Sequence, residues 1–420
     1  MTSSAGPAHP TMRLHGWTAT LTTAATLLLA GPAAAQLTGI VFHDRNRNGV
    51  RDAGEEGLAR IVVSNQIDVT ATTADGAFSL PGPGTGVAFV SVPDGYRASG
   101  PFWRSGIAAP PPAARGQQAA GAGSLDFGLV ATPRLDSFTF VHASDPHVQR
   151  LTLGRLERAL TIVDSGRPAF VLMSGDLVRD ALRVPEAEAR EYYALYVRTI
   201  AGTSAPVWNA PGNHELFGIE RNLSNVSPDH PLYARAMYRQ YLGPDYYSFN
   251  FGCVHFVALN TVDHDDMWYH GNVDSTQLAW LGRDLAAIPA DMPVVTFNHI
   301  PLFSAAPAFD GYDDGLPAPT LIEVRGRTQF RHVVANAREV YRSVRSHPYP
   351  LALGGHNHMR ELLEFDWDGG RTRFEQAAAI VGPRDAGPIV VPSGVTLYRV
   401  TNGVIGAGTF IPLDPPPARR

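Results

Sequence analysis

Short apolar runs separated by turn residues characterise the chain from Gln36 to about Val130. The runs show no helical period, and each has the length of a β-strand bounded by Gly, Pro, Asn or Asp. They are Gly39–Phe42, Ile61–Val63, Val69–Thr72, Ala77–Leu80 and Val87–Val92. This pattern predicts a small all-β sandwich domain over residues 36–130.

The pattern changes near Leu135, where apolar runs begin to alternate with amphipathic segments, as in layered α/β folds. Five of these runs end in Asp, Asn or His side chains. They are Phe138–Val141 before Asp145 and His147, Phe170–Met173 before Asp176, Val207–Trp208 before Asn213 and His214, Val294–Phe297 before His299, and Leu351–Leu353 before His356 and His358. Since open α/β sheets place their ligand sites at the carboxyl ends of strands, we expect these side chains to form one site.

Composition narrows the chemistry of that site. All 34 basic residues of the 420 are Arg, so chemistry that needs a lysine amine, such as P-loop ATP hydrolysis or Schiff-base formation, is excluded. Cys253 is the single cysteine, so an intrachain disulfide, a cysteine zinc site and an iron–sulfur cluster are excluded. It lies in an apolar run that predicts a strand. The net charge of −5 disfavours a nucleic-acid-binding surface. Imidazole and carboxylate ligands without thiolates suit Mn, Fe or Zn.

The N-terminus has the features of a secretory signal peptide. Arg13 precedes the apolar run 20–30, and Ala33 to Ala35 offer an A-x-A cleavage site before Gln36. We therefore expect residues 1–35 to be removed and the protein to be secreted or periplasmic. The alternative is an uncleaved membrane anchor. No later run reaches the roughly 18 apolar residues of a transmembrane helix, so none is expected in the mature form.

One loop of the predicted β domain has the spacing of an EF-hand calcium loop. Its oxygen-bearing side chains occupy loop positions 1, 3, 5, 9 and 12, with Gly49 at position 6 and a backbone carbonyl at position 7. The predicted Ca²⁺ ligands are Asp44, Asn46, Asn48, Val50, Asp52 and Glu55. Because strands flank this loop, it is no true EF-hand, and the alternative is an Asn-Gly hairpin turn that binds nothing.

Both regions resemble known families. The calcium loop, Ala74–Leu80 and Leu125–Leu129 resemble the calcium-binding B-repeats of bacterial surface adhesins and the N-terminal domain of secreted bacterial calcineurin-like phosphoesterases. The ordered blocks Asp-x-His, Gly-Asp, Gly-Asn-His-Glu, His and Gly-His-x-His, between about Leu135 and Phe365, resemble the calcineurin-like metallophosphoesterase superfamily. The second resemblance implies a four-layer α/β/β/α sandwich over residues 131–413 with a short C-terminal β extension, followed by a disordered tail at 414–420.

The resemblance also implies a role for each site residue. A first divalent metal would take Asp145, His147, Asp176 and His358, and a second would take Asp176, Asn213, His299 and His356. Asp176 would bridge them, and a hydroxide between the metals would attack phosphorus. His214 would stabilise or protonate the leaving alkoxide, with Glu215 orienting it, capping a helix or lying in solvent. Purple acid phosphatases carry Tyr where this chain has Arg179, and the Asp that supports the catalytic His in protein phosphatases is displaced by one, to Asp180.

Three functional interpretations follow. The leading one is a secreted dinuclear phosphoesterase that hydrolyses phosphomono- or phosphodiesters, and the complete ligand set favours it. The alternative is a calcium-stabilised surface adhesion or binding protein with an inert phosphoesterase fold. Metal-dependent hydrolysis of a non-phosphate bond stays open, because fold and metals do not choose a substrate. The pattern does not indicate an oligomeric state.

Overall fold

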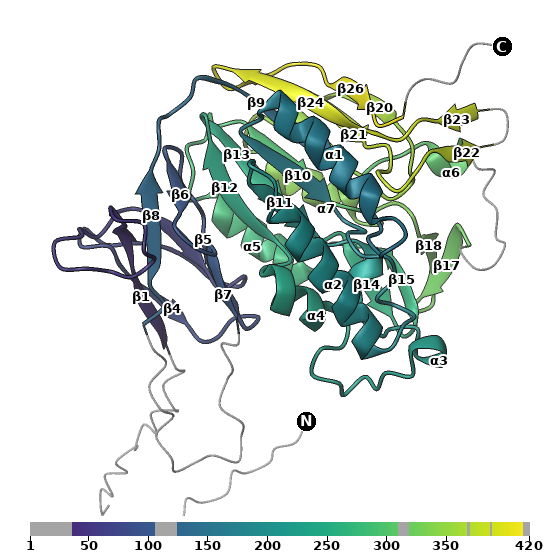
Figure 1. Cartoon of the computed structure of the whole chain (residues 1–420), viewed down its shortest axis with the longest axis horizontal. Helices are drawn as coiled ribbons and strands as arrows, with labels where there is room; N and C mark the ends of the chain where they lie inside the picture. The colour runs from purple at the N-terminus through teal and green to yellow at the C-terminus, as the bar shows by residue number, and fades with distance from the viewer. Residues whose placement is uncertain (1–35, 106–123, 310–318, 368–369, 387–388, 415–420) are drawn as a thin grey trace, which may run out of the picture. The chain divides into compact units, whose positions relative to one another are not determined.

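The computed structural model describes residues 36–105, 124–309, 319–367, 370–386 and 389–414 (Figure 1). The predicted signal peptide and nearly all of the predicted tail lie outside these residues. No helix within the described part of the chain is long and apolar enough to cross a membrane. Residues Ala35–Arg420 form one compact unit, so the N-terminal β region packs onto the rest of the chain.

The N-terminal region is all-β, as predicted. It contains two four-stranded sheets, ordered β4-β1-β8-β6 and β3-β2-β5-β7. The strands are β1 (Gln36–His43), β2 (Val62–Ser64), β3 (Val69–Ala71), β4 (Ala77–Pro81), β5 (Val87–Val90), β6 (Tyr96–Ala98), β7 (Trp103–Ser105) and β8 (Phe127–Ala131). Alternating apolar residues of β1 and β4 turn inward with Phe89 and Phe127, and burial of these side chains stabilises the region.

Two six-stranded sheets follow. The first has the order β11-β10-β9-β24-β25, with β26 also paired to β24. Its strands are β9 (Ser137–Ala143), β10 (Phe170–Ser174), β11 (Val207–Ala210), β24 (Gly394–Thr401), β25 (Val404–Ile405) and β26 (Thr409–Pro412). The second has the order β12-β13-β16-β19-β21-β20. Its strands are β12 (Tyr247–Phe251), β13 (Val254–Ala258), β16 (Val294–Phe297), β19 (Leu351–Gly354), β20 (Glu361–Trp367) and β21 (Gly370–Gln376).

Helices and short hairpins connect these strands. The helices are α1 (Leu153–Gly166), α2 (Glu186–Ile200), the 3-10 turn η1 (Asn213–Glu215), α3 (Arg221–Ser224), α4 (Arg235–Leu242), α5 (Ser275–Leu285), α6 (Ala306–Phe309) and α7 (Ala337–Val344). The hairpins are β14 (Val262–Asp265) with β15 (Trp268–Gly271), β17 (Leu321–Val324) with β18 (Arg327–Phe330), and β22 (Arg384–Ala386) with β23 (Ile389–Val391). The mixed α/β arrangement agrees with the sequence prediction.

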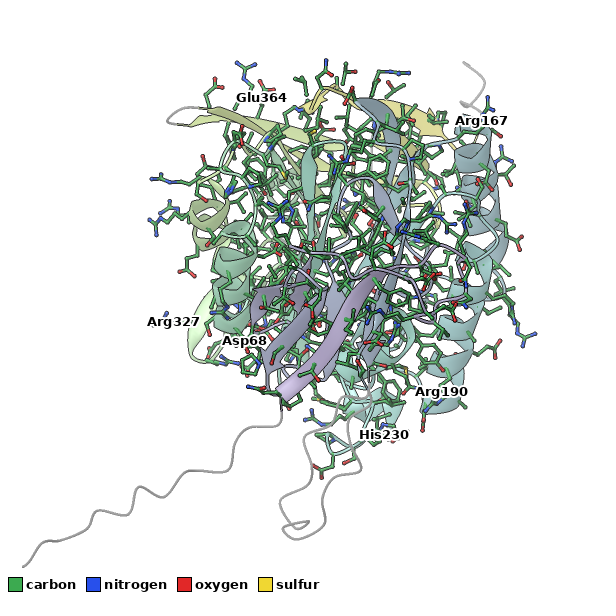
Figure 2. All side chains as sticks on the ribbon, turned by 90° about the vertical axis from the view of Figure 1, so that its left-hand side faces the viewer. Asp68, Arg167, Arg190, His230, Arg327 and Glu364 are labelled. Atoms are coloured by element: carbon green, nitrogen blue, oxygen red, sulfur yellow. The ribbon has the colours of Figure 1, made fainter. Side chains whose placement is uncertain are left out.

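Aromatic side chains join the two large sheets. Phe140 of β9 lies 5.5 Å from Phe256 of β13 between ring centres, and Phe170 of β10 lies 5.4 Å from Phe249 of β12. On the other face of the first sheet, α1 and α2 pack on β9 and β10 through a separate apolar cluster (Figure 1). Exposed charged residues such as Arg167 and Glu364 point away from the sheets (Figure 2). The core thus fixes the strands whose ends carry the predicted site.

The prediction for Cys253 was wrong in one respect. The residue lies in the turn between β12 and β13 and is exposed, with a left-handed backbone (φ 64°). The two apolar runs on either side of Cys253 are separate antiparallel strands, and the Gly252-Cys253 turn joins them. The sequence prediction missed this turn because apolar residues lie on both sides of it.

Candidate metal centre

The carboxyl ends of five strands bring the predicted ligands together. Strands β9, β10 and β11 are parallel neighbours in the first sheet, and β16 and β19 are parallel neighbours in the second. Each is followed within three residues by at least one of the predicted side chains. Five of the ligand residues have left-handed backbones: Asp145, His147, Asp176, His356 and His358. Such φ values strain non-glycine residues and concentrate at functional sites, because the surrounding fold enforces them.

Two glycines allow the loops to approach this closely. A Cβ at Gly175 would lie 2.6 Å from the His299 ring, and Gly175 itself has a φ of 86°. A Cβ at Gly212 would lie 2.2 Å from the backbone nitrogen of Asp176. The Gly before a ligand in these blocks is therefore required by packing, since any side chain would push two ligand loops apart.

The first donor group comprises side-chain atoms of Asp145, His147, Asp176 and His358. His358 Nε2 lies 3.1 Å from Asp145 Oδ1 and 3.2 Å from His147 Nε2. His147 Nε2 lies 3.7 Å from Asp176 Oδ2. Two atoms that each lie about 2.1 Å from one ion are about 3 to 4 Å apart, depending on the angle between the two bonds. The spacing of these atoms therefore fits ligands that surround a common cation.

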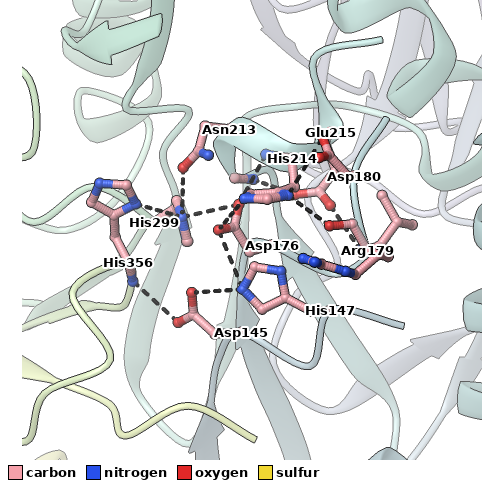
Figure 3. Close-up of polar contacts among 12 residues, drawn as sticks. Asp145, His147, Asp176, Arg179, Asp180, Asn213, His214, Glu215, His299 and His356 are labelled. Carbon is pink, nitrogen blue, oxygen red and sulfur yellow. Dashed lines mark hydrogen bonds and ion pairs between the residues drawn. The ribbon is translucent and has the colours of Figure 1, made fainter. Parts of the chain in front are cut away.

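The second donor group comprises side-chain atoms of Asp176, Asn213, His299 and His356 (Figure 3). His299 Nε2 lies 3.1 Å from Asp176 Oδ1, 3.2 Å from Asn213 Oδ1 and 3.1 Å from His356 Nδ1. The other ring nitrogen of His299 donates to the Ser174 carbonyl at 2.8 Å, which fixes the ring. The two oxygens of Asp176 face different groups, so this carboxylate is placed to bridge two ions.

The hydrogen bonding of Asp145 and the pKa shifts of neighbouring ligand side chains bear on a metal-binding role. Asp145 Oδ1 is buried and accepts no well-aligned hydrogen bond from the described residues, although His358 Nε2 is near it. Burial raises the pKa of Asp176, but the His214 and His299 imidazoles hold that pKa well below its ordinary value. Burial, and then the His214 ring, lower the pKa of His147 to about 3. Burial lowers the pKa of His299, but the Asp176 carboxylate raises it to about 9. Ionised carboxylates and neutral imidazoles are the forms that bind divalent cations, so binding of a cation here would release a proton from His299.

His214 lies at the side of this cluster. Its Nδ1 bonds to the carbonyl of Arg179 at 2.7 Å, and its Nε2 lies 3.7 Å from Asp176 Oδ2. With His147 and Asp176 it forms a third set of atoms close enough to hold a metal. Asp180 Oδ1 lies 3.8 Å from Nδ1, so Asp180 faces His214 even though its sequence position is displaced. The Arg179 carbonyl, however, holds the ring.

Glu215 does not contact the His214 ring. Its carboxylate is buried and accepts hydrogen bonds from the backbone N–H of Val178 at 3.0 Å and of Gly212 at 2.6 Å. Burial and the nearby Asp176 carboxylate raise the pKa of Glu215 to about 8. Of the roles considered for Glu215, the structure shows the capping role, which holds the Asn213 loop against the loop of Asp176.

A cavity of about 440 Å³ opens onto the cluster. The sequence prediction did not include six of its lining residues as site residues: Arg179, Tyr269, His332, Asn357, Val381 and Arg384. His332 Nδ1 lies 2.7 Å from His356 Nε2, and the two rings are stacked. His332 follows the β17–β18 hairpin, far from any strand-end block, so only the tertiary fold brings it to the site.

The predicted calcium ligands occupy one compact loop. Asp44 accepts backbone N–H bonds from Arg47 at 2.7 Å and Gly49 at 2.7 Å. Asp52 Oδ2 accepts from the amides of Asn46 at 2.6 Å and Asn48 at 2.7 Å. Glu55 bonds back to the start of the loop through Arg45 N at 2.8 Å, and Val50 is exposed. The structure thus brings all six residues into one loop, and calcium binding there stays a prediction.

One family model and several solved structures match this chain. The model of the calcineurin-like phosphoesterase family matches residues 138–360, just over half of the chain. A dimetal phosphatase from Danio rerio is 16% identical and covers 63% of this chain and 93% of its own, with a TM-score of 0.42. A purple acid phosphatase from yellow lupin seeds is 14% identical and covers 66% of this chain and 53% of its own, with a TM-score of 0.41. No curated protein sequence matches the chain.

The matched residues include all five blocks that deliver the donor atoms. The chain therefore belongs to the calcineurin-like phosphoesterase family.

Proposed function

We propose that this protein is a dinuclear metal-dependent phosphoesterase that hydrolyses phosphomono- or phosphodiesters. The observation that carries the proposal is the pair of donor groups that share the carboxylate of Asp176. Family membership supports a phosphate ester as the substrate. Two divalent transition metals held there, Mn, Fe or Zn, would lower the pKa of a water molecule and stabilise charge on the phosphoryl oxygens.

Within this proposal the chain itself positions the metals and moves one proton. The oxygen of a water molecule bonds to phosphorus, and the bond from phosphorus to the ester oxygen breaks. The departing oxygen takes the Nε2 proton of His214, whose Nδ1–H stays bonded to the Arg179 carbonyl. A proton from the attacking water later returns His214 to its charged form. The net change is hydrolysis of one P–O bond.

We further propose a four-layer arrangement, a signal peptide and a calcium site. The separate apolar cluster of α1 and α2 and the packing of α5 and α7 with the second sheet support four α/β/β/α layers. The A-x-A sequence before Gln36 supports export to the periplasm or the medium. The ordered loop from Asp44 to Glu55 supports a Ca²⁺ site in the N-terminal region.

Removal and restoration of metals tests the catalytic proposal. A chelator should abolish hydrolysis of 4-nitrophenyl phosphate or bis(4-nitrophenyl) phosphate, and Mn, Fe or Zn added singly should restore it. Full activity of metal-free protein would contradict the proposal. Protein that holds two metals and hydrolyses neither ester would instead support an inert fold in a binding protein. Cleavage of a carboxylic ester alone would favour a non-phosphate substrate.

A further inference from the structure

The cavity above the donor groups has a strongly positive rim. Two guanidinium groups, those of Arg179 and Arg384, line it, and the carboxylate of Asp176 is the single one among the described lining residues. The carboxylates of Asp145 and Asp176 would neutralise only half the charge of two divalent cations. The guanidinium of Arg179 therefore adds to an existing positive excess.

Arg179 is positioned by its backbone rather than by its side chain. Its N–H donates to the Val148 carbonyl at 3.0 Å, and its carbonyl accepts from His214 Nδ1 at 2.7 Å. The side chain is exposed and makes no hydrogen bond or ion pair with the described residues. Figure 3 shows the guanidinium on the His147 side of the cluster. The loop thus presents a guanidinium that forms no ion pair with a carboxylate of the described residues.

Arg384 presents a second positive charge beside the His356–His358 loop. Its Nη1 donates to the Asn357 carbonyl at 2.6 Å, which holds the guanidinium at the edge of the cavity. Arg179 lies on the loop after β10, and Arg384 is the first residue of β22 in another sheet. Their approach to one cavity is therefore a product of the tertiary fold.

We propose that the preferred substrate is a phosphate ester whose leaving group carries a second anionic group, a carboxylate or a phosphate. This inference rests on the proposed function. In that function His214 faces the leaving oxygen, and Arg179, whose backbone carbonyl holds the His214 ring, lines the same cavity. A planar guanidinium binds carboxylate or phosphate oxygens through paired N–H donors. A neutral leaving group would leave that charge unpaired.

A pair of monoesters with similar leaving alkoxides tests the inference. Glycerol 1-phosphate has a neutral leaving group, and 3-phosphoglycerate carries a carboxylate on it. The metal-loaded protein should show a kcat/KM for 3-phosphoglycerate that is roughly 10- to 100-fold higher, the usual range for a charged hydrogen bond. In Arg179→Gln this ratio should fall to near one. Arg198→Gln, an exposed arginine of α2 outside the cavity, is the matched control and should keep the ratio.

Binding measured by calorimetry distinguishes this inference from the proposed function. Tighter binding of 3-phosphoglycerate than of glycerol 1-phosphate, lost in Arg179→Gln, supports the anionic subsite even where no ester is hydrolysed. Hydrolysis of both esters with equal kcat/KM would overturn the inference and leave the proposed function standing. A ratio unchanged in Arg179→Gln would also overturn it. Glycerol 1,3-bisphosphate, whose leaving group carries a phosphate and no carboxylate, compares phosphate with carboxylate as the second anion.

Discussion

The imidazole of His214 is held through one nitrogen only. The Arg179 carbonyl accepts from Nδ1, while Nε2 faces Asp176 and the cavity. Each of the other imidazoles in the site has a nitrogen within about 3.2 Å of a metal-ligand atom of another side chain. His214 therefore has the geometry of a group that exchanges a proton with substrate, although its proximity to His147 and Asp176 also permits a ligand role.

Replacing His214 by Asn separates these two roles. We expect the variant to retain two metals and to lose roughly 10²–10⁴ in kcat, the usual contribution of a positioned acid or base. The loss should be smaller for 4-nitrophenyl phosphate than for an alkyl phosphate, because nitrophenolate needs little protonation. Elemental analysis of the metal content, carried out on the samples used for kinetics, checks both expectations. Loss of metal from the variant would identify His214 as a ligand.

Residue identity predicted the donor atoms but not the shape of their loops. Asp145 and His356 stand at strand ends that the apolar pattern marks, so their place in a site follows from the sequence. Their left-handed backbones do not, because φ there is imposed by tertiary contacts such as those at Gly175. His332 was missed for the same reason, since the hairpin before it carries no metal-ligand pattern.

At the scale of elements, the calcium loop differs from the metal centre because its proposed ligands lie close together in the sequence. All of its proposed ligands lie within twelve residues, and hydrogen bonds of Asp44 and Glu55 to nearby backbone N–H groups fix its shape. Local spacing could therefore predict it without knowledge of the fold. The loop follows β1, which pairs with β4 and β8, so an ion there would stabilise the end of a central strand.

Calcium should stabilise the protein without taking part in catalysis. Extracellular calcium modules bind with Kd of roughly 10⁻⁴–10⁻³ M. At ten times Kd, a ligand of the folded state alone adds about 1.4 kcal/mol to the free energy of unfolding. We expect a rise in Tm of the metal-loaded chain on addition of calcium. The double variant Asp44→Ala, Glu55→Ala should lose this rise and keep ester hydrolysis. An equal rise in the double variant would place the calcium elsewhere, and no rise in either would favour an ordinary turn.

At the scale of the whole molecule, buried polar contacts join the β region to the phosphoesterase region. Trp280 Nε1 of α5 donates to Ser64 Oγ at 3.1 Å, and Gln66 Nε2 donates to Asp245 Oδ1 at 3.1 Å. Burial raises the pKa of Asp245, but the Arg239 guanidinium lowers it to about 2, so Gln66 bonds to a charged acceptor. The sequence predicted the two regions. It did not predict the interface between them, because that interface depends on hydrogen bonds between residues about 180 positions apart in the chain.

Exported protein should begin at or near Gln36. The A-x-A site ends at Ala35, and β1 begins at Gln36, so cleavage there leaves the described fold intact. Mass spectrometry of protein recovered from the periplasm or medium checks the N-terminus. Peptides from residues 20–30 in that material would contradict cleavage and favour a retained anchor.

The central claim is that one carboxylate serves two metals, and Asp176→Asn tests it most directly. Asp229→Asn, an exposed carboxylate outside the cavity, is the matched control. Metal content per chain by elemental analysis is measured with turnover of 4-nitrophenyl phosphate on the same samples. We predict that Asp176→Asn loses metal and at least about 10³-fold in kcat together, while the control keeps both. Two metals per chain with near-normal turnover in Asp176→Asn would contradict the dinuclear account.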